Sequence, residues 1–410
     1  MDKKFGLLGE KLGHSYSPQI HALLQDYEYK LYEVEKSNVE KFLKTTELSG
    51  MNVTIPYKKT VMESCVWLSE AAKKIGAVNT LVKHEGGWHG YNTDYYGFSE
   101  LVKVSGIDVK GKKALVLGSG GASNTVCHAL NDMGAAEVIV ISRSGENNYD
   151  NLGRHKDAEI IVNTTPVGMY PNNGRAAVDL RLFPECKGVL DVIYNPARTA
   201  IMLQAEELSI LHAGGLYMLT AQAKKSSELF TGASIDDGVI AAITDRLGSK
   251  MQNIVLIGMP GSGKSSIGKK LSELTGKRLI EADAEIVKKA GRDIPAIFRE
   301  SGETEFRRIE TEVLSEIGKL SDCIISTGGG CVTRKENYPL LHQNGHIVWI
   351  KRDISALPVD GRPISQANPL DKLYAERKDK YASFADTEIV NDGTVEAAAK
   401  KIAEKWSPEK

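Results

Sequence analysis

The sequence predicts an α/β protein with two separate nucleotide-binding sheets. The chain has 410 residues, which is more than one hydrophobic core usually organises, so we expect two or three domains. Two short apolar runs, at 113–118 and 253–258, each end in a glycine-rich turn that a helical pattern follows. A strand, a glycine turn and a helix in this order open a βαβ unit, and two such openings predict two sheets.

The overall composition excludes several classes of protein. Lys and Arg number 52 and Asp and Glu 53, so the net charge of −1 gives no sign of nucleic-acid binding. No apolar stretch approaches the ~18 residues that cross a bilayer, and the first residues lack the apolar segment of a signal peptide. The five cysteines form no Cys-x-x-Cys pair, which favours a reduced, cytoplasmic protein over a disulfide scaffold or a zinc protein. The sequence leaves the oligomeric state open.

The chain divides into five predicted segments. Its first hundred residues carry polar motifs without a nucleotide-type opening, whereas the next part alternates strand and helix patterns. A later helical pattern is expected to pack back on the first lobe, and a cleft is expected between the two lobes. The predicted boundaries are 1–102 for a substrate-binding lobe, 103–235 for a nucleotide-binding lobe, 236–247 for the returning helix, 248–252 for a polar linker and 253–410 for a second nucleotide-binding domain.

The second half carries the most specific motif. Residues 258–265, Gly-Met-Pro-Gly-Ser-Gly-Lys-Ser, fit the P-loop pattern in its strand–loop–helix context. Backbone N–H groups of such a loop surround phosphate oxygens, Lys264 reaches the terminal phosphates and the Ser265 hydroxyl binds Mg²⁺. The complete pattern favours an ATP–Mg²⁺ site over an ordinary glycine turn. The candidate nucleotide-binding residues are Gly261, Ser262, Gly263, Lys264, Ser265 and Ser266.

Further along, charged residues and glycines indicate what accepts the phosphate. Glu281 and Asp283 follow the next apolar run, and three glycines, 328–330, follow a third. Arginine can bind a carboxylate through two hydrogen bonds or neutralise a phosphoryl group in transfer. Each arginine alone is more often a surface ion-pair residue, but the combination predicts a phosphoryl-transfer site. The candidate arginines are Arg307, Arg362 and Arg377.

In these motifs residues 252–404 resemble shikimate kinase. The resemblance implies that shikimate is phosphorylated by ATP at its 3-hydroxyl, with Asp283 orienting that hydroxyl and accepting its proton. It also implies that Arg307 and Arg377 bind the shikimate carboxylate. The backbone of Gly328, Gly329 and Gly330 would hold the ring, and Arg362 would close over the ATP phosphates from a lid.

Two features depart from this family. Glu281 stands where the family usually has Asp. The stretch 354–362 is shorter than the family's helix and lid, and it lacks a clear counterpart of the basic residue that contacts adenine. A shorter lid predicts more ATP hydrolysis or a higher nucleotide KM, because lid closure excludes water.

The first half carries a different nucleotide motif. Residues 118–123, Gly-Ser-Gly-Gly-Ala-Ser, follow a strand and open a helix, which suits a pyrophosphate at a helix N-terminus. The glycine turn alone is a weak signal. Ser142 and Arg143 end the following strand, where an arginine favours the 2′-phosphate of NADP over the free hydroxyl of NAD. A solvated surface arginine is the other interpretation.

Four polar segments lie upstream of this turn, and they supply the donors and acceptors that a polyhydroxy acid needs. Lys58 and Asp94 could form a proton-transfer pair if the fold brings them together. Each segment alone is typical of turns, in which Asn, Thr, Ser and Pro are common. The segments are 13–18, 52–58, 76–80 and 92–94.

Across residues 4–247 these segments and the glycine turn, with 163–169 and 215–222, resemble shikimate dehydrogenase. The resemblance implies hydride transfer between NADPH and the ring carbonyl of 3-dehydroshikimate, with Lys58 as general acid and Asp94 as its partner. It assigns substrate binding to Ser15, Ser17, Thr54, Asn79, Tyr194 and Gln222, together with Lys58 and Asp94. It assigns cofactor binding to Gly118, Ser119, Gly120, Gly121, Ala122, Ser142, Arg143, Val192, Gly215 and Met218.

This half also departs from its family. The crossover at 143–158 is shorter than usual, and Glu146 stands where a second positive charge would help. NADP preference therefore depends mainly on Arg143, with Arg154 as the second candidate. Together the two resemblances imply an α/β chain in which a two-lobed shikimate dehydrogenase-like module, with a substrate lobe and a Rossmann-like NADP lobe, precedes a P-loop kinase domain with a parallel sheet.

The leading hypothesis is a bifunctional enzyme in which the product of the first half is the substrate of the second. One alternative is a catalytically inactive metabolite sensor built on the same folds, and another is a dehydrogenase that prefers quinate. A sensor should have lost some of the catalytic residues, and all are present, namely Lys58, Asp94, Lys264, Asp283 and Arg307. Assays with shikimate plus NADP⁺ and with shikimate plus ATP distinguish the hypotheses.

Overall fold

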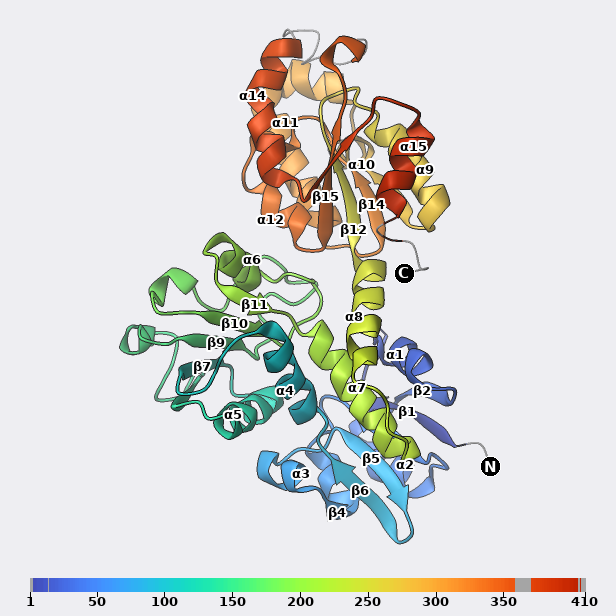
Figure 1. The fold of residues 1–410 in the computed structure, drawn as a ribbon, viewed down its shortest axis with the longest axis vertical. Helices are drawn as coiled ribbons and strands as arrows, with labels where there is room; N and C mark the ends of the chain where they lie inside the picture. Colours follow the sequence, from blue (N-terminus) through green and yellow to red (C-terminus); the bar gives the residue numbers. More distant parts are fainter. Residues whose placement is uncertain (1–2, 14, 358–369, 405, 407–410) are drawn as a thin grey trace. The chain divides into compact units, whose positions relative to one another are not determined.

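The computed structural model describes residues 3–13, 15–357, 370–404 and 406. By its internal contacts the chain forms two units, which are described separately (Figure 1). The first unit comprises Met1–Gly168, Arg175–Tyr194 and Ile201–Asp245, and the second comprises Met169–Gly174, Asn195–Ala200 and Arg246–Lys410.

The first unit begins with a six-stranded mixed sheet in the order β2-β1-β3-β5-β6-β4. β1 pairs in parallel with β2 and β3, whereas β5 runs antiparallel to β3 and β6. The strands are β1 (Lys4–Gly9), β2 (Glu28–Glu33), β3 (Gly50–Val53), β4 (Cys65–Leu68), β5 (Thr80–His84) and β6 (Gly87–Tyr91). The helices of this lobe are α1 (Ser17–Leu24), α2 (Val39–Thr45) and α3 (Glu70–Ile75).

A second sheet of the first unit has five parallel strands in the order β11-β10-β9-β7-β8. The run 114–117 is fully buried, with alternate side chains in two separate core clusters, because helices cover both faces of a parallel sheet. The strands are β7 (Lys113–Leu117), β8 (Glu137–Ile141), β9 (Ile160–Asn163), β10 (Gly188–Asp191) and β11 (Leu211–Ala213). The helices are α4 (Asp94–Ser105), α5 (Gly121–Asp132), α6 (Ala200–Glu207) and α7 (Leu216–Thr231).

The short crossover between β8 and β9 folds as a compact loop with one 3₁₀ turn, η3 (Leu152–His155). Side chains of the loop hold its backbone: Asn151 Nδ2 donates to the carbonyl of Glu146 at 2.7 Å, and His155 Nε2 lies 3.0 Å from Asn147 Oδ1. Hydrogen bonds inside the loop thus take the place of the helix that usually makes such a connection.

Helices α4 and α7 pack unusually closely. A Cβ atom at Gly97 of α4 would lie 2.6 Å from the carbonyl oxygen of Met218 in α7. Only glycine avoids this clash with the backbone, so Gly97 sets the distance between the two helices. The contact brings the first turn of α4 beside the first two turns of α7.

Two predicted boundaries differ from the structure. The boundary between 102 and 103 falls inside α4, because Leu101 and Val102 are buried in the core of the second sheet. The returning helix, α8 (Gly238–Met251), is longer than predicted and includes most of the linker 248–252. Lys277 stabilises this last turn, since its ammonium donates to the carbonyls of residues 249, 250 and 252 at 3.3, 2.7 and 3.0 Å.

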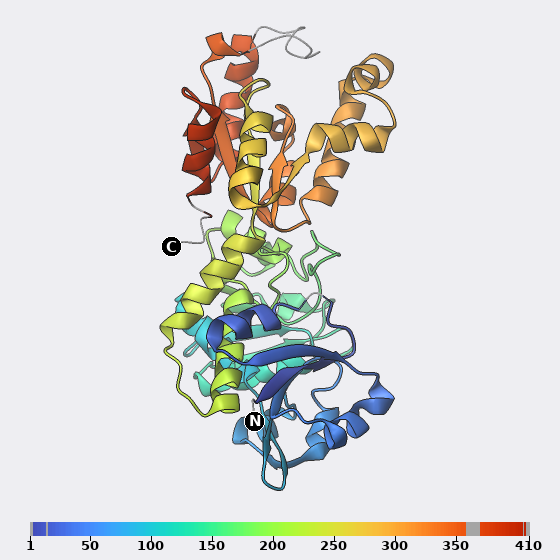
Figure 2. The ribbon, with the colours of Figure 1, turned by 90° about the vertical axis from the view of Figure 1, so that its right-hand side faces the viewer.

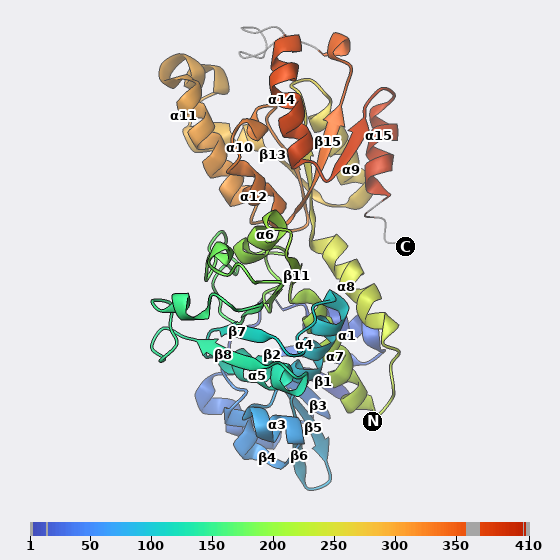
Figure 3. The ribbon, with the colours of Figure 1, turned by 60° about the vertical axis from the view of Figure 1, so that its left-hand side comes forward.

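The second unit is built on a five-stranded parallel sheet in the order β13-β14-β12-β15-β16. Helices cover both faces, with α9 and α15 on one side and α10, α11, α12 and α14 on the other (Figures 2 and 3). The strands are β12 (Asn253–Ile257), β13 (Arg278–Glu281), β14 (Cys323–Ser326), β15 (Gly345–Lys351) and β16 (Thr387–Val390). The helices are α9 (Lys264–Thr275), α10 (Ala282–Ala290), α11 (Ile294–Ile317, interrupted at Gly302), α12 (Asn337–His342), α14 (Leu370–Phe384) and α15 (Val395–Ala403).

The three sheets confirm the predicted α/β class. In the two parallel sheets, the apolar runs predicted as strands form β7, β12 and β14, and a glycine-rich turn follows each of them. Within the described part of the chain, no helix combines the length and the apolar character needed to cross a membrane.

Candidate functional sites

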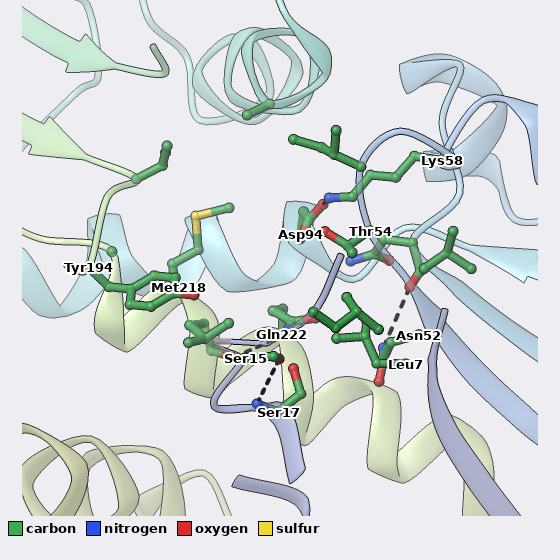
Figure 4. Close-up of a pocket in the computed structure, with 18 of the residues that line it drawn as sticks. Leu7, Ser15, Ser17, Asn52, Thr54, Lys58, Asp94, Tyr194, Met218 and Gln222 are labelled. Carbon is green, nitrogen blue, oxygen red and sulfur yellow. Dashed lines mark hydrogen bonds and ion pairs between the residues drawn. The ribbon is translucent and has the colours of Figure 1, made fainter. Parts of the chain in front are cut away.

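A cavity of about 510 Å³ lies in the first unit (Figure 4). The β1–α1 loop, the loop after β3, the first turns of α4 and α5, the segment after β10 and helix α7 all contribute to its wall. All eight substrate-binding residues predicted for the first half line it, namely Ser15, Ser17, Thr54, Lys58, Asn79, Asp94, Tyr194 and Gln222.

Lys58 and Asp94 form an ion pair in this cavity. Lys58 Nζ donates to Asp94 Oδ2 at 2.6 Å, and Figure 4 shows the lysine side chain directed at the carboxylate. Both side chains are mostly buried, with exposed fractions of 26% and 15%. Asp94 is the first residue of α4. The close packing of α4 on α7 therefore places it in the same cavity wall as Met218 and Gln222 of α7. The pair can donate and recover a proton at a bound oxygen atom.

One threonine fixes two of the cavity's amide side chains. The backbone N–H of Thr93 donates to Asn79 Oδ1 at 2.7 Å, and Asn79 Nδ2 donates to Thr93 Oγ1 at 3.1 Å. Thr93 Oγ1 also donates to Gln222 Oε1 at 3.3 Å. These bonds determine which way each amide presents its donor and acceptor, as recognition of ring hydroxyls requires.

The two serines lie where the β1–α1 loop enters α1. The backbone N–H of Ser17 donates to Ser15 Oγ at 3.2 Å, and the N–H of Ser15 donates to the carbonyl of Leu12 at 2.9 Å. Nearby, the rings of Tyr16 and Tyr194 meet edge to face with centroids 6.1 Å apart. Burial raises the pKa of Tyr194, which therefore stays a neutral hydrogen-bonding phenol.

Sequence reasoning missed two polar residues of this cavity, Lys11 and Asn52. Asn52 opens the polar segment 52–58, which was a usable signal, and its amide is bound on all sides. It accepts from Tyr29 OH at 2.8 Å and donates to Ser226 Oγ at 2.7 Å and Thr80 Oγ1 at 3.1 Å. Lys11 belongs to no motif, so only the folded loop reveals it.

The predicted cofactor residues fall into two groups. Ala122, Val192, Gly215 and Met218 line the same cavity as the substrate-binding residues, which makes its other side suitable for a nicotinamide ring. A Cβ at Gly215 would lie 2.2 Å from the carbonyl oxygen of Val192, so only glycine permits this close approach.

The remaining group lies at the glycine turn and at the end of β8. Gly118 has φ +103°, which favours glycine, and a Cβ at Gly120 or Gly121 would meet open space. Because α5 begins at Gly121, its first N–H groups can bind a pyrophosphate there. Arg143 is exposed and follows the end of β8, near Tyr149. Burial raises the pKa of Tyr149, and the positive charge of Arg143 opposes this rise. None of the six residues of this group lines the cavity, namely Gly118, Ser119, Gly120, Gly121, Ser142 and Arg143.

A second cavity, of about 690 Å³, lies in the second unit at the carboxyl ends of its strands. Arg362 lies outside the described residues, and Ser262 is buried beneath the loop rather than in the wall. Every other predicted residue of this half lines the cavity: Gly261, Gly263, Lys264, Ser265, Ser266, Asp283, Arg307, Gly328, Gly329, Gly330 and Arg377.

The P-loop has the geometry that phosphate binding requires. Gly261 and Gly263 have φ +83° and +98°, which glycine adopts without strain. Lys264 Nζ donates to the carbonyls of Gly258 and Met259 at 3.0 Å each, which holds the ammonium against the loop. Ser265 Oγ donates to Glu281 Oε2 at 3.0 Å. These hydroxyl and carboxylate oxygens are hard ligands that fit Mg²⁺.

Asp283 lies at the first turn of α10 and faces the P-loop lysine. Burial raises the pKa of its carboxyl, the Glu281 carboxylate raises it further, and the cations Lys264 and Arg307 oppose both effects. A carboxylate with a raised pKa in a buried site is a suitable proton acceptor for a hydroxyl.

Arg307 is almost fully buried and held by two carboxylates of its own helix. Its Nη1 donates to Glu310 Oε2 at 2.7 Å and its Nη2 to Glu303 Oε1 at 3.1 Å. Across the cavity, Arg377 Nη1 donates to the carbonyl of Gly329 at 3.2 Å. Two guanidinium groups thus border the three-glycine turn, as binding of a carboxylate requires. Glu310 was missed by sequence reasoning, although its spacing from Arg307 is typical of a helical ion pair.

The three-glycine turn leaves room for Arg307. A Cβ at Gly330 would lie 2.1 Å from Arg307 Nη2, so Gly330→Ala must displace the guanidinium. We expect this variant to raise the KM for the phosphate acceptor roughly tenfold or more, because a charge-assisted contact is lost. Steady-state kinetics with acceptor and ATP varied in turn check the prediction. An unchanged acceptor KM, or an equal rise in the ATP KM, would contradict the role of this glycine.

Comparison with known proteins identifies both halves. The family model for the shikimate dehydrogenase substrate binding domain matches residues 7–81, and the model for shikimate kinase matches residues 260–407. The shikimate dehydrogenase (NADP(+)) of Clostridium perfringens strain SM101 is 37% identical over 266 residues, which cover 60% of this chain and 98% of that protein.

Solved structures agree for the first half. A chorismate mutase/shikimate 5-dehydrogenase fusion protein from Clostridium acetobutylicum is 37% identical with a TM-score of 0.58, covering 61% of this chain and 98% of that chain. Shikimate 5-dehydrogenase from Thermus thermophilus, solved with NADP(H) and shikimate, is 31% identical with a TM-score of 0.55, covering 60% and 99%. This chain belongs to the shikimate dehydrogenase family and carries a shikimate kinase domain after it, which makes it a bifunctional fusion enzyme of the shikimate pathway.

Proposed function

We propose that the first unit reduces 3-dehydroshikimate to shikimate with NADPH and that the second phosphorylates shikimate to shikimate 3-phosphate with ATP and Mg²⁺. The observation that carries the proposal is the Lys58–Asp94 ion pair, at 2.6 Å, in a cavity lined by all eight predicted substrate-binding groups. The P-loop, Asp283 and two arginines around one cavity support the second step. Shikimate, the product of the first reaction, is then the substrate of the second.

In the reduction, NADPH supplies the hydride, and the protein binds the substrate and moves a proton. The Lys58 ammonium donates a proton to the carbonyl oxygen as negative charge develops there, and Asp94 orients the ammonium and stabilises its charge. Asn79 and Gln222, held by Thr93, bind ring hydroxyls. Val192, Gly215 and Met218 form the wall against which the nicotinamide would lie.

NADP preference is proposed to depend on Arg143. We expect Arg143→Ala to raise the KM for NADPH about tenfold while the KM for NADH changes less than twofold, because only NADPH carries the 2′-phosphate. Initial rates with each coenzyme measure the effect. The exposed Lys156 is the matched control, since Lys156→Ala removes a positive charge from the same crossover at a residue with no predicted cofactor role. Equal effects of Arg143→Ala on both coenzymes would refute the role.

In the phosphorylation, Asp283 accepts the proton of the attacking hydroxyl, and Lys264 neutralises charge on the transferred phosphoryl group. Arg307 and Arg377 bind the shikimate carboxylate beside the three-glycine turn. Mg²⁺ would be held by Ser265 and Glu281, whose oxygens lie 3.0 Å apart, and it neutralises phosphate charge when bound. Arg362 remains the proposed contact to the ATP phosphates from the lid.

The raised pKa of Asp283 predicts how phosphorylation depends on pH. Only the ionised carboxylate accepts a proton, so activity is lost as the pH falls through the pKa, which lies above the ordinary aspartate value of about 3.9. We therefore expect kcat/KM for phosphorylation to fall on an acid limb whose midpoint lies above the ordinary aspartate value, chiefly because Asp283 is buried. A profile of kcat/KM against pH at saturating Mg²⁺ measures this midpoint. A limb at or below the ordinary value would contradict the raised pKa.

Two assays of the full chain test the proposed function. Shikimate with NADP⁺ should produce NADPH, and shikimate with ATP and Mg²⁺ should produce ADP and a phosphate ester. Silence in both assays would favour a metabolite sensor, and a higher kcat/KM with quinate than with shikimate would favour the quinate alternative. The assembled Lys58–Asp94 pair argues for an enzyme over a sensor. A cytoplasmic location stays a prediction from the sequence, in which the five cysteines form no Cys-x-x-Cys pair.

A further inference from the structure

The charges around the dehydrogenase cavity are unevenly distributed. Among its described wall residues, three are lysines or aspartates: Lys11, Lys58 and Asp94. Lys58 and Asp94 neutralise each other at 2.6 Å. Lys11 forms no ion pair or side-chain hydrogen bond with another described residue, so it has no counter-ion among the described wall residues.

The backbone around Lys11 is fixed, although its side chain is exposed. The next residue, Leu12, is buried, and its N–H donates to Glu33 Oε1 at 2.7 Å. The carbonyl of Leu12 accepts from the N–H of Ser15 at 2.9 Å. The turn therefore holds Lys11 on the same loop as Ser15 and Ser17, whose hydroxyls also face the cavity.

We propose that Lys11 recognises the carboxylate of the substrate and thereby selects cyclic acids over uncharged rings. This inference rests on the proposed reduction of 3-dehydroshikimate, whose ring bears one carboxylate. The carboxylate is disfavoured near Asp94 by like charge, and the Lys58 ammonium is needed at the ring carbonyl. The loop with Lys11 and the two serine hydroxyls offers a cation and neutral donors without a carboxylate in the wall.

The test compares substrates with and without the charge in the full chain. Three variants are assayed with NADP⁺ and either shikimate or its methyl ester: Lys11→Ala, Lys11→Arg and Lys41→Ala. The affinity for the ester is measured from its turnover as a substrate or from its competitive inhibition of shikimate oxidation. Lys41 is the matched control, because it is an exposed lysine of the same lobe outside the cavity. We expect Lys11→Ala to raise the KM for shikimate at least fivefold, with kcat and the KM for NADP⁺ within twofold.

The ester separates charge recognition from a structural role. Lys11→Ala should change the affinity for the methyl ester less than twofold, and Lys11→Arg should restore the KM for shikimate. In the wild type the shikimate KM should rise with ionic strength more steeply than in Lys11→Ala. An equal loss for shikimate and ester, or a shikimate KM unchanged in Lys11→Ala, would overturn the inference. Wild-type protein that does not oxidise shikimate would instead contradict the proposed function itself.

Discussion

Lys264→Ala is expected to lower the phosphorylation rate at least a thousandfold and to leave the reduction of 3-dehydroshikimate unchanged. The ammonium is nearly buried and fixed to two P-loop carbonyls at 3.0 Å each, so no other group of the loop can take its place beside the terminal phosphates. Pre-positioned charge of this kind supplies much of the stabilisation in phosphoryl transfer. ADP formation with saturating shikimate and ATP measures the loss.

The control for this variant is Lys269→Ala. Lys269 is an exposed lysine on the same helix α9 and lies outside the cavity, so its replacement should change phosphorylation less than twofold. Thermal unfolding of both variants checks that the fold is retained. A folded Lys264→Ala enzyme with more than a tenth of the wild-type rate would rule out the proposed role.

Lys58→Ala is expected to lower kcat for reduction by about a thousandfold while phosphorylation stays within twofold of the wild type. The variant removes the proton donor, and general acid catalysis contributes factors of about 10²–10⁴. It also leaves the Asp94 carboxylate in the cavity without its partner at 2.6 Å. Absorbance of NADPH at saturating 3-dehydroshikimate follows the reaction.

Two further variants make this result specific. The next residue, Lys59, is exposed and outside the cavity wall, so Lys59→Ala should retain the wild-type rate. Asp94→Asn keeps the shape of the partner without its charge and should lower kcat less than Lys58→Ala does. If Lys58→Ala silenced both activities in a folded protein, the two sites would not act independently.

The motifs predicted which residues lie in each site better than they predicted how those residues are held. Lys58 and Asp94 are 36 positions apart, and their contact depends on a helix packing distance that no local pattern encodes. Lys11 was missed because it belongs to no recognisable motif, and the cavity alone shows its position. Arg307 was predicted to bind the substrate carboxylate, but only the structure shows that Glu303 and Glu310 of the same helix orient its guanidinium.

The fold class was predictable because buried apolar runs and glycine turns are local signals. The predicted linker at 248–252 is mostly helical in the structure, and polar composition alone had suggested a linker there. The decisive contact comes from Lys277, whose ammonium binds the last carbonyls of α8 from 25 to 28 positions away. Lone charged residues that cap a helix from a distance have no signature in the segment that they stabilise.

The missing side chain at Gly97 bears on how the dehydrogenase could be remodelled. This glycine lies outside the cavity wall, yet it fixes how near the helix carrying Asp94 stands to the helix carrying Gln222. A methyl group there would push against Met218 and Gln222, two residues of the cavity wall, and so shift wall groups without replacing any of them. Variant libraries that aim at bulkier ring acids could therefore include Gly97, where a larger residue changes the spacing of the two helices. Compensating substitutions along α7 would be included in the same library.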